Sequence, residues 1–269
     1  MGDIFSDIAL ARRLERAESL ANARSVEARR RLMPDSGAQW IEVAGAYAMY
    51  DGVRSPLTQT FGLGMFEMPS AADMDTIEAF FKDRGAPVFQ EVSPLADKSL
   101  LPLLGERGYR PVELTSVMFL PLSGRAAATT SGPIEVRVAA ADERDLWAQT
   151  AAEGWRELAG IADLMLELAR VSSAAEGTLP FLAELDGRAI ATGALAIHNG
   201  VALLAGASTI PEWRHRGAQR ALLEARLARA TRAGCDLATM CAEPGSASQR
   251  NAERQGFRIA YTRIKWGLA

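Results

Sequence analysis

The stretch IPEWRHRGAQRALLEARLARA, residues 210–230, contains a helix whose start is unusual. Leu223, Leu227 and Ala230 recur at the spacing of one helix face, which predicts a helix that begins near Gly217. A helix N-terminus is the positive end of the helix dipole, so it normally prefers acidic side chains. Basic side chains gather at this end instead: Arg214, His215, Arg216 and Arg220.

These side chains indicate an anion site. Main-chain N–H groups at a helix start, the positive dipole end and nearby arginines together bind phosphate groups. Gly217 lets the backbone come close to a ligand, and the small Ala218 leaves that approach open. The stretch therefore predicts a phosphate or pyrophosphate held mainly by main-chain amides. A solvated basic turn is the alternative that the residues alone leave open.

Composition restricts the class of protein. The chain has 269 residues, enough for two domains, and 48% of them are hydrophobic. A net charge of -3 argues against a nucleic-acid partner. No apolar run approaches the roughly 18 residues of a membrane span, so no membrane partner is expected. The two histidines lack ligand spacing, which predicts no metal. Cys235 and Cys241, too far apart along one expected strand to pair, fit a cytoplasmic location.

An internal repeat divides the chain. GAYAMYDGV (45–53) resembles GALAIHNGV (193–201), and both predict a strand, an Asx-Gly turn and a second strand. Farther along, ERGYR resembles ERQGFR, and Gly108 and Gly256 have the same separation as the first pair of segments. Each of these glycines follows a helical pattern and precedes a strand, where a left-handed residue is common. We interpret this as one fold used twice; chance similarity is the alternative.

The two copies differ at one helix start. In the first copy, Pro69 leads directly into SAADMDTIEAFF, an ordinary acidic start with Ser70 as its cap. In the second, Pro211 leads into the longer cationic loop. The sequence therefore predicts a domain over residues 1–125 without the anion loop, a linker over 126–132 that is rich in small and polar residues, and a ligand-binding domain over 133–269.

The sequence pattern of the second domain predicts an α+β fold with a mixed, mostly antiparallel sheet. We expect a strand, two helices, and three antiparallel strands with turns at Asp186-Gly187 and Asn199-Gly200. The long helix, a strand, a short helix and a last strand follow. The first domain is expected to contain a reduced set of the same elements, preceded by a long N-terminal helix over residues 4–32.

These segments resemble the GNAT superfamily of acyltransferases. STIPEWRHRGAQRALLEARL is similar to its coenzyme-A-binding segment, and NAERQGFR is similar to its closing helix and Gly-Phe strand. The resemblance covers about residues 133–269, and the first half resembles a degenerate copy, so the chain resembles a tandem GNAT protein.

The resemblance implies a set of acetyl-CoA-binding residues. Those expected to wrap the pyrophosphate are Arg214, His215, Arg216, Gly217, Ala218 and Gln219. The backbone of Ser208, Thr209 and Ile210 is expected to pair with the pantetheine arm. Ser248 and Asn251, on the short helix, are expected near the pantetheine or the nucleotide.

The resemblance also implies attack of a neutral amine on the acetyl thioester. The position of the family's tyrosine, a frequent general acid, holds Ala252, so Tyr261 is the candidate replacement and a half-buried strand aromatic is its alternative role. Glu243 is the candidate base, and a surface glutamate is the alternative. Three residues between the first two helices are candidates for the acceptor site, or else ordinary helix and loop residues: Glu153, Trp155 and Glu157.

The resulting hypothesis is a cytoplasmic acyltransferase that moves an acetyl group from acetyl-CoA to an amine of a small molecule or peptide. Two alternatives stay open. One is a non-catalytic acyl-CoA-binding regulatory module. The other is a tandem enzyme that acylates a non-amine or uses an aminoacyl donor. The sequence predicts neither the acceptor nor the oligomeric state.

Overall fold

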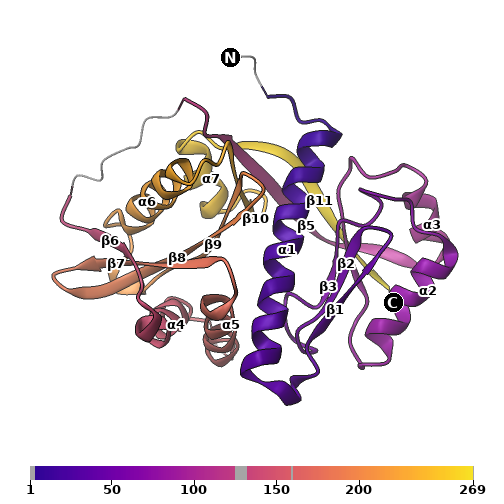
Figure 1. The fold of residues 1–269 in the computed structure, drawn as a ribbon, viewed down its shortest axis with the longest axis horizontal. Coiled ribbons are helices and arrows are strands. Elements are labelled where there is room, and N and C mark those ends of the chain that lie inside the picture. Colours follow the sequence, from indigo (N-terminus) through magenta and orange to yellow (C-terminus); the bar gives the residue numbers. More distant parts are fainter. Residues whose placement is uncertain (1–3, 125–131, 159, 269) are drawn as a thin grey trace. The chain divides into compact units, whose positions relative to one another are not determined.

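The computed structural model describes residues 4–124, 132–158 and 160–268, which form two compact units (Figure 1). Unit 1 consists of residues 1–119 and 241–269, and unit 2 of residues 120–240. Most of the predicted linker, residues 126–131, lies outside the described residues. The unit boundaries therefore differ from the domains predicted from the repeat, because residues 241–269 pack with the N-terminal segment.

Unit 1 holds one sheet with the strand order β1-β2-β3-β4-β11-β5. Its elements are α1 (Ile8–Leu32), a 3₁₀ helix (Pro34–Ser36), β1 (Gln39–Val43), β2 (Ala46–Tyr50), β3 (Gln59–Phe61), α2 (Ala71–Lys82), β4 (Phe89–Val92), α3 (Leu100–Glu106), β5 (Tyr109–Pro121), α7 (Ala247–Arg254) and β11 (Arg258–Leu268). The C-terminal strand β11 lies antiparallel between β4 and β5. A strand from the far end of the sequence thus completes the sheet of unit 1.

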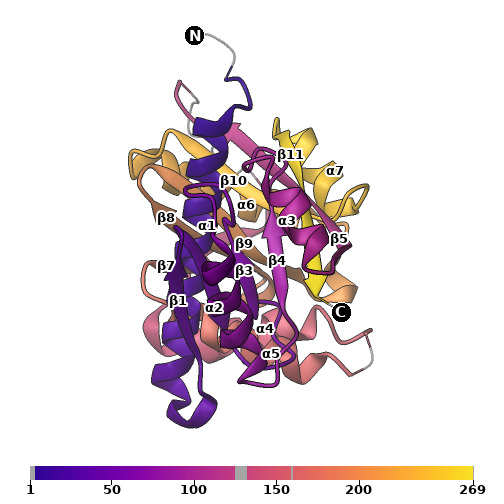
Figure 2. The same cartoon turned by 90° about the vertical axis from the view of Figure 1, so that its right-hand side faces the viewer.

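The two faces of this sheet are covered by different helices. Tyr47 and Met49 of β2 belong to a buried cluster with residues of α1, whereas Ala46 and Ala48 belong to a cluster with residues of α2 and α3. Successive strand residues point to opposite faces, so β2 serves both clusters. Figure 1 shows α1 and α2 on either side of β2, and Figure 2 shows these elements from the side of α2. Ser70 caps α2 as its sequence predicted, and it forms a capping box with Asp73.

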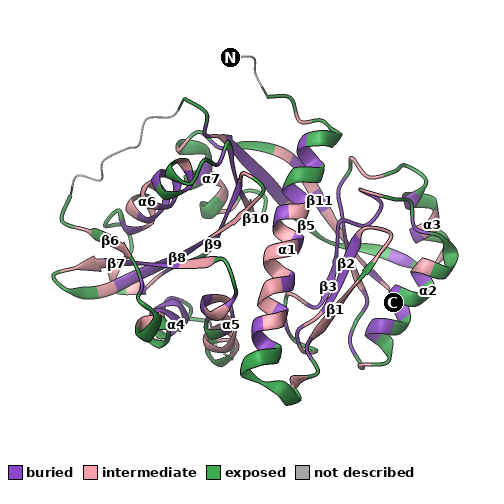
Figure 3. Ribbon diagram, viewed as in Figure 1, coloured by how far each residue is buried: buried purple, intermediate pink, exposed green. Residues whose placement is uncertain are grey.

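The strands of unit 2 have the order β10-β9-β8-β7-β6 in the sheet. Its elements are β6 (Glu135–Val138), a 3₁₀ helix (Ala141–Glu143), α4 (Arg144–Glu153), α5 (Ala162–Ala174), β7 (Thr178–Leu185), β8 (Arg188–His198), β9 (Val201–Thr209), a 3₁₀ helix (Pro211–Trp213), α6 (Ala218–Arg232) and β10 (Leu237–Ala242). Helices α4 and α5 cover one face of this sheet and α6 covers the other (Figure 1). Figure 3 shows β8 mostly buried between these layers.

The predicted fold class is confirmed, since most strand pairs in both units are antiparallel. The turns at Asp186-Gly187 and Asn199-Gly200 are also confirmed. All four residues have positive φ, as a two-residue hairpin with this twist requires. Gly108 and Gly256 both follow helices with positive φ, at 86° and 92°.

The matching turn predicted at Asp51-Gly52 is wrong. Strands β2 and β3 pair, but a longer loop joins them. The Asp51 carboxylate accepts hydrogen bonds from Arg29 at 2.5 and 3.0 Å and from the Ser55 hydroxyl at 2.6 Å. These bonds hold Asp51 inside unit 1, so it does not form the tip of a tight turn.

Candidate functional site

Strand β9 carries a bulge shortly before it ends. Ser208 pairs with Thr192 and Ala205 pairs with Ala194, so Gly206 and Ala207 together lie opposite a single residue of β8. Gly206 has a φ of 61°, which is a conformation that favours glycine. Residues 205–207 are exposed, although the first four residues of β9 are buried.

The bulge lies where β9 has left its other neighbour. Strand β10 runs parallel to β9, and the paired residues are Val201–Leu203 with Leu237–Thr239. From residue 204 onward β9 continues towards Thr209 without a partner residue on β10 in the part of unit 2 that the structure describes. This segment of β9 therefore has no strand partner on that edge, although the carbonyls of Ala205, Gly206 and Ser208 accept hydrogen bonds from side chains.

The loop after β9 ends at an open helix start. Gly217 is the N-cap of α6, with a φ of 88°, and His215 has a φ of 63° that is uncommon for a non-glycine residue. The Ala221 amide donates to the Gly217 carbonyl at 3.0 Å. The amides before it in the first turn have no carbonyl partner within the helix. A Cβ atom at Gly217 would meet nothing within 4 Å, so a ligand can reach this backbone. The predicted helix start near Gly217 is confirmed.

The basic side chains of the loop have different surroundings. The Arg214 guanidinium donates to the Glu157 carboxylate at 2.6 Å and to the Gly154 carbonyl at 2.9 Å. Arg216 instead lies over the ring of Trp213, 4.8 Å from its centroid, and is exposed. Arg214 therefore ties the loop to the end of α4, whereas Arg216 and His215 are exposed at the open helix start.

Gln219 joins the helix start to the end of β9. Its side-chain amide donates to the Ser208 carbonyl at 2.8 Å and to the Thr209 hydroxyl at 2.9 Å. The side chain thus points towards the strand and leaves the main chain in front of the helix uncovered. Ala218 and Ile210 are buried, and the Ile210 amide donates to the Ile190 carbonyl at 3.0 Å. These bonds fix the loop that connects β9 with α6.

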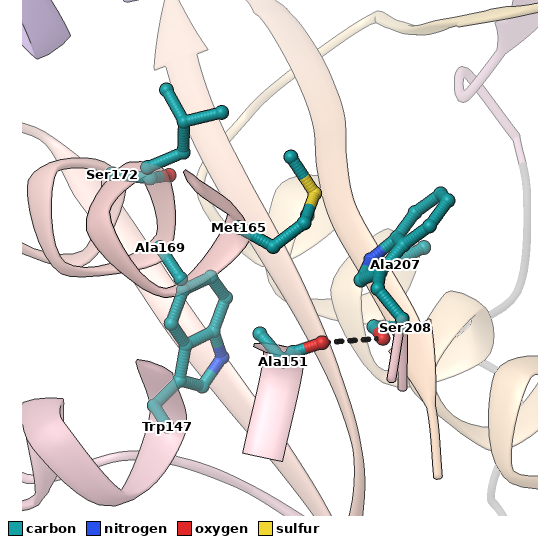
Figure 4. A pocket seen from close by; sticks show the side chains of 10 residues that line it. Trp147, Ala151, Met165, Ala169, Ser172, Ala207 and Ser208 are labelled. Carbon is teal, nitrogen blue, oxygen red and sulfur yellow. Dashed lines mark hydrogen bonds between the residues drawn. The ribbon is translucent and has the colours of Figure 1, made fainter. Parts of the chain in front are cut away.

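A pocket of about 240 Å³ lies between the bulge and the pair of helices α4 and α5 (Figure 4). Its lining residues are Trp147, Ala151, Trp155, Met165, Leu168, Ala169, Ser172, Gly206, Ala207 and Ser208. The Ser208 hydroxyl donates to the Ala151 carbonyl at 2.8 Å, as Figure 4 shows. The predicted residues Trp155 and Ser208 therefore meet in one pocket, with Met165 and Leu168 as lining residues that the sequence did not single out.

The other two predicted acceptor residues do not line this pocket. Glu157 pairs with Arg214, and Glu153 pairs with Arg156, which also pairs with Glu212. The Arg156–Glu212 and Glu157–Arg214 pairs therefore connect the turn after α4 with the loop after β9. Gly154 in this turn packs closely on the strand, because a Cβ atom there would lie 1.9 Å from the Ser208 hydroxyl oxygen.

Arg226 is a residue near the bulge that the sequence did not reveal. It is buried in α6, and its guanidinium donates to the carbonyls of Ala194 and Ala205 at 3.2 and 3.1 Å. Burial lowers the pKa of this guanidinium to about 10. Gly193 leaves room for it, since a Cβ atom there would lie 2.8 Å from the guanidinium carbon. Arg226 thus holds the two carbonyls that flank the bulge.

The remaining predicted residues lie in unit 1. Glu243, Ser248 and Asn251 are exposed. Tyr261 is buried, and its hydroxyl donates to Glu15 at 2.8 Å. Burial, followed by the neighbouring Glu15 carboxylate, raises the Tyr261 pKa well above its usual value. Tyr261 is thus a strand aromatic, as in the alternative, but more buried than the half-buried one expected, and this burial weighs against a role as general acid. The catalytic roles stay predictions.

Three further observations concern the cysteines, metal ions and membrane-spanning helices. Cys235 and Cys241 are both free thiols. Within the described ranges, no group of three or more His, Cys, Asp or Glu side chains is placed to hold a metal ion. None of the helices that the structure describes is both long enough and apolar enough to cross a membrane.

Residues 143–257 match the family model of the acetyltransferase (GNAT) family. No curated protein matches the sequence of this chain. Among solved structures, the chain is similar to a GCN5-related N-acetyltransferase from Kribbella flavida, with 18% identity, a TM-score of 0.64, and coverage of 91% of this chain and 94% of that one.

Two further solved structures share the fold. A GCN5-related N-acetyltransferase from Sphaerobacter thermophilus is 20% identical, with a TM-score of 0.55 over 78% of this chain and 71% of that one. A tandem GNAT protein from the clavulanic acid biosynthesis pathway is 12% identical, with a TM-score of 0.59 over 84% of this chain and 78% of that one. At these identities the likeness shows the fold alone.

Proposed function

Because residues 143–257 match the acetyltransferase (GNAT) family, we propose that the chain transfers an acetyl group from acetyl-CoA to an amine of a small molecule or peptide. The amine attacks the thioester directly and must be neutral to do so. Acetyl-CoA is a co-substrate in this proposal and supplies the activated acetyl group. The N-acetyl specificity and a cytoplasmic location belong to the proposal as well.

One observation carries this proposal: an uncapped helix start that combines free amides, basic side chains and open space. The first turn of α6 contains no acidic residue, and no side chain caps Gly217. A Cβ atom at Gly217 would point into open space, which leaves room for a phosphate. We assign the pyrophosphate to the main chain of residues 217–219, with Arg216 and His215 beside it. Arg214 is not assigned a direct contact with the pyrophosphate, because its side chain already donates to the Glu157 carboxylate.

The pantetheine arm is assigned to the unpaired edge of β9. Main-chain groups near Ser208 and Thr209 bind it as a further strand would, while the Ser208 carbonyl remains bonded to Gln219. The thioester then lies near the bulge at Gly206 and Ala207. Glu243 as the base, and contacts from Ser248 and Asn251 to the cofactor, remain proposals that rest on the sequence pattern.

A second candidate function is a non-catalytic acyl-CoA-binding module. Two observations favour it: Ala252 provides no acid, and the Tyr261 hydroxyl is buried and bonded to Glu15. A catalyst can dispense with a protein acid where water protonates the leaving thiolate. The binding module retains the same cofactor site but leaves the thioester intact.

The test measures free CoA thiol when the full chain meets acetyl-CoA and a panel of amines. Calorimetry of acetyl-CoA binding accompanies it. Binding with amine-dependent thiol release supports the acetyltransferase. Binding without release for any amine supports the binding module, and absence of binding contradicts both.

A further inference from the structure

The pocket between the bulge of β9 and helices α4 and α5 has a lining that indicates a class of acceptor. We infer that it takes an uncharged apolar group of the amine acceptor, so that the acceptor is a monoamine with an aromatic or branched aliphatic group. This inference rests on the proposed function, and it adds the substrate class to it.

The side chains around the pocket are mostly apolar. Trp147 and Trp155, Met165 and Leu168, and the small Ala169 form its walls. No Asp, Glu, Lys, Arg or His side chain is among the described lining residues. Burying a charged group here without a partner would be costly, whereas burying an apolar group is favourable.

The polar groups of the lining are largely satisfied within the protein. The Ser208 hydroxyl donates to the Ala151 carbonyl at 2.8 Å. The Trp147 indole N–H donates to the Phe181 carbonyl at 3.0 Å. Ser172 adds one hydroxyl and Trp155 one indole N–H. A polar acceptor would therefore lose its water without gaining matching hydrogen bonds.

The carboxylates in the turn after α4 and in the loop after β9 are engaged by arginines. Glu153 and Glu212 both pair with Arg156, and Glu157 pairs with Arg214. A second ammonium group on the acceptor would have to displace one of these pairs. Dications such as polyamines therefore find no ready counter-charge at this site.

The volume and the position of the pocket fit this occupant. Its volume of about 240 Å³ exceeds the roughly 150 Å³ of an apolar cavity that holds benzene. Gly206 and Ala207 of the bulge form part of its wall. The pocket lies on the sheet face covered by α4 and α5, whereas the proposed phosphate site begins α6 on the other face (Figure 1). An acceptor seated here therefore reaches the bulge from the face opposite the donor.

The experiment compares amines of similar length on the full chain with acetyl-CoA. 2-Phenylethylamine and 3-methylbutylamine represent the proposed class, and agmatine and 1,4-diaminobutane represent dications. We expect kcat/KM for the apolar amines to be higher by roughly 10- to 100-fold. With CoA bound, calorimetry should detect binding of 2-phenylethylamine and not of agmatine.

Two variants of α5 sharpen the test. Met165→Glu places a carboxylate in the pocket and should shift the kcat/KM ratio towards the dications by roughly 10-fold or more. Ala162→Glu adds the same charge at an exposed position outside the lining and should leave the ratio unchanged. Circular dichroism and acetyl-CoA affinity establish that both variants fold.

Three results would overturn the inference; the first two leave the proposed function intact, and the third also changes the acyl donor. The first is a preference of the wild-type chain for the dications. The second is binding of acetyl-CoA without binding or turnover of either apolar amine. The third is a preference for hexanoyl-CoA over acetyl-CoA that Met165→Glu abolishes, because the pocket would then hold the acyl chain. Failure to bind acetyl-CoA at all would instead contradict the proposed function.

Discussion

Replacing Gly217 with alanine separates a ligand-binding role of this glycine from a purely conformational one, because α6 offers a matched control. Gly217 precedes the helix with a φ of 88°, and Gly234 follows it with a φ of 79°. A Cβ atom at either position would meet nothing within 4 Å. Gly217→Ala and Gly234→Ala therefore introduce the same methyl group into similar backbone conformations and similar open space.

The conformational cost should be alike in both variants. A non-glycine residue in the left-handed region costs roughly 1–2 kcal/mol. For a chain of this size that lowers the melting temperature by roughly 2–8 °C. Only Gly217→Ala places a methyl group where the pyrophosphate is proposed to lie. Loss of one charge-assisted hydrogen bond, about 1.5–3 kcal/mol, weakens acetyl-CoA binding by roughly 10- to 100-fold.

The assay combines thermal melts followed by circular dichroism with calorimetric titration of acetyl-CoA. We expect similar melting temperatures for the two free variants, and an affinity loss in Gly217→Ala alone. Equal affinities in the two variants, whether both reduced or both unchanged, would refute the assignment of the pyrophosphate to this helix start.

Three further predictions concern charged groups. Arg216→Ala should weaken acetyl-CoA binding by roughly 10-fold with little change in melting temperature. Arg214→Ala should instead lower the melting temperature by roughly 1–3 °C. The opposite pattern in thermal melts and calorimetry would contradict these two assignments. Burial raises the pKa of Glu15, so its ionisation opposes folding above that pKa. Glu15→Gln can still accept from Tyr261 and leaves Arg263 paired with Glu18 and Glu91, so it should stabilise the chain by roughly 1 kcal/mol at pH 8. Below the usual pKa of 4.5 Glu15 is protonated in both the folded and the unfolded state, so the stability gain of the variant should vanish. Urea titrations that show the same gain at every pH would exclude ionisation of Glu15 as its cause. Arg226→Met should cost roughly 1–3 kcal/mol in urea unfolding, since it removes the guanidinium that donates to the buried Ala194 carbonyl and to the Ala205 carbonyl. A loss below about 0.5 kcal/mol would show that the guanidinium does not support the bulge.

The parts of the site that could be predicted are continuous in the sequence. The helix start at Gly217 and the hairpin turn at Asn199-Gly200 depend on local conformational preferences, which neighbouring residues express directly. Trp155, which the sequence singles out as an acceptor-site candidate, lines the pocket, and its role there stays a prediction.

The parts that could not be predicted depend on tertiary packing. Arg214 and Arg216 are two positions apart, yet only Arg214 reaches Glu157, because that contact depends on where the turn after α4 lies. The bulge in β9 follows from its register with β8, which no local pattern encodes. Arg226 has the sequence environment of an exposed helix cation, and only the adjacent Gly193 makes room for its burial.

The position of β11 in the sheet also depends on tertiary packing and could not be predicted from the sequence. Its pattern predicts a strand, and the structure confirms that strand over Arg258–Leu268. The pattern does not specify partners, and β11 pairs with β4 and β5 of unit 1. In that position Arg263 of β11 makes buried ion pairs with Glu15 and Glu91, at 3.3 and 2.9 Å. These partners come from distant parts of the sequence.

The central claim, that the start of α6 holds the pyrophosphate of an acyl-CoA, is tested most directly by a crystal structure of the full chain with acetyl-CoA. We predict pyrophosphate oxygens within about 3.2 Å of main-chain amides of residues 217–219, which is ordinary hydrogen-bonding distance. We also predict the pantetheine arm along β9 between Gly206 and Ile210. Acetyl-CoA bound elsewhere on the chain, with the amides of residues 217–219 facing solvent, would contradict the claim.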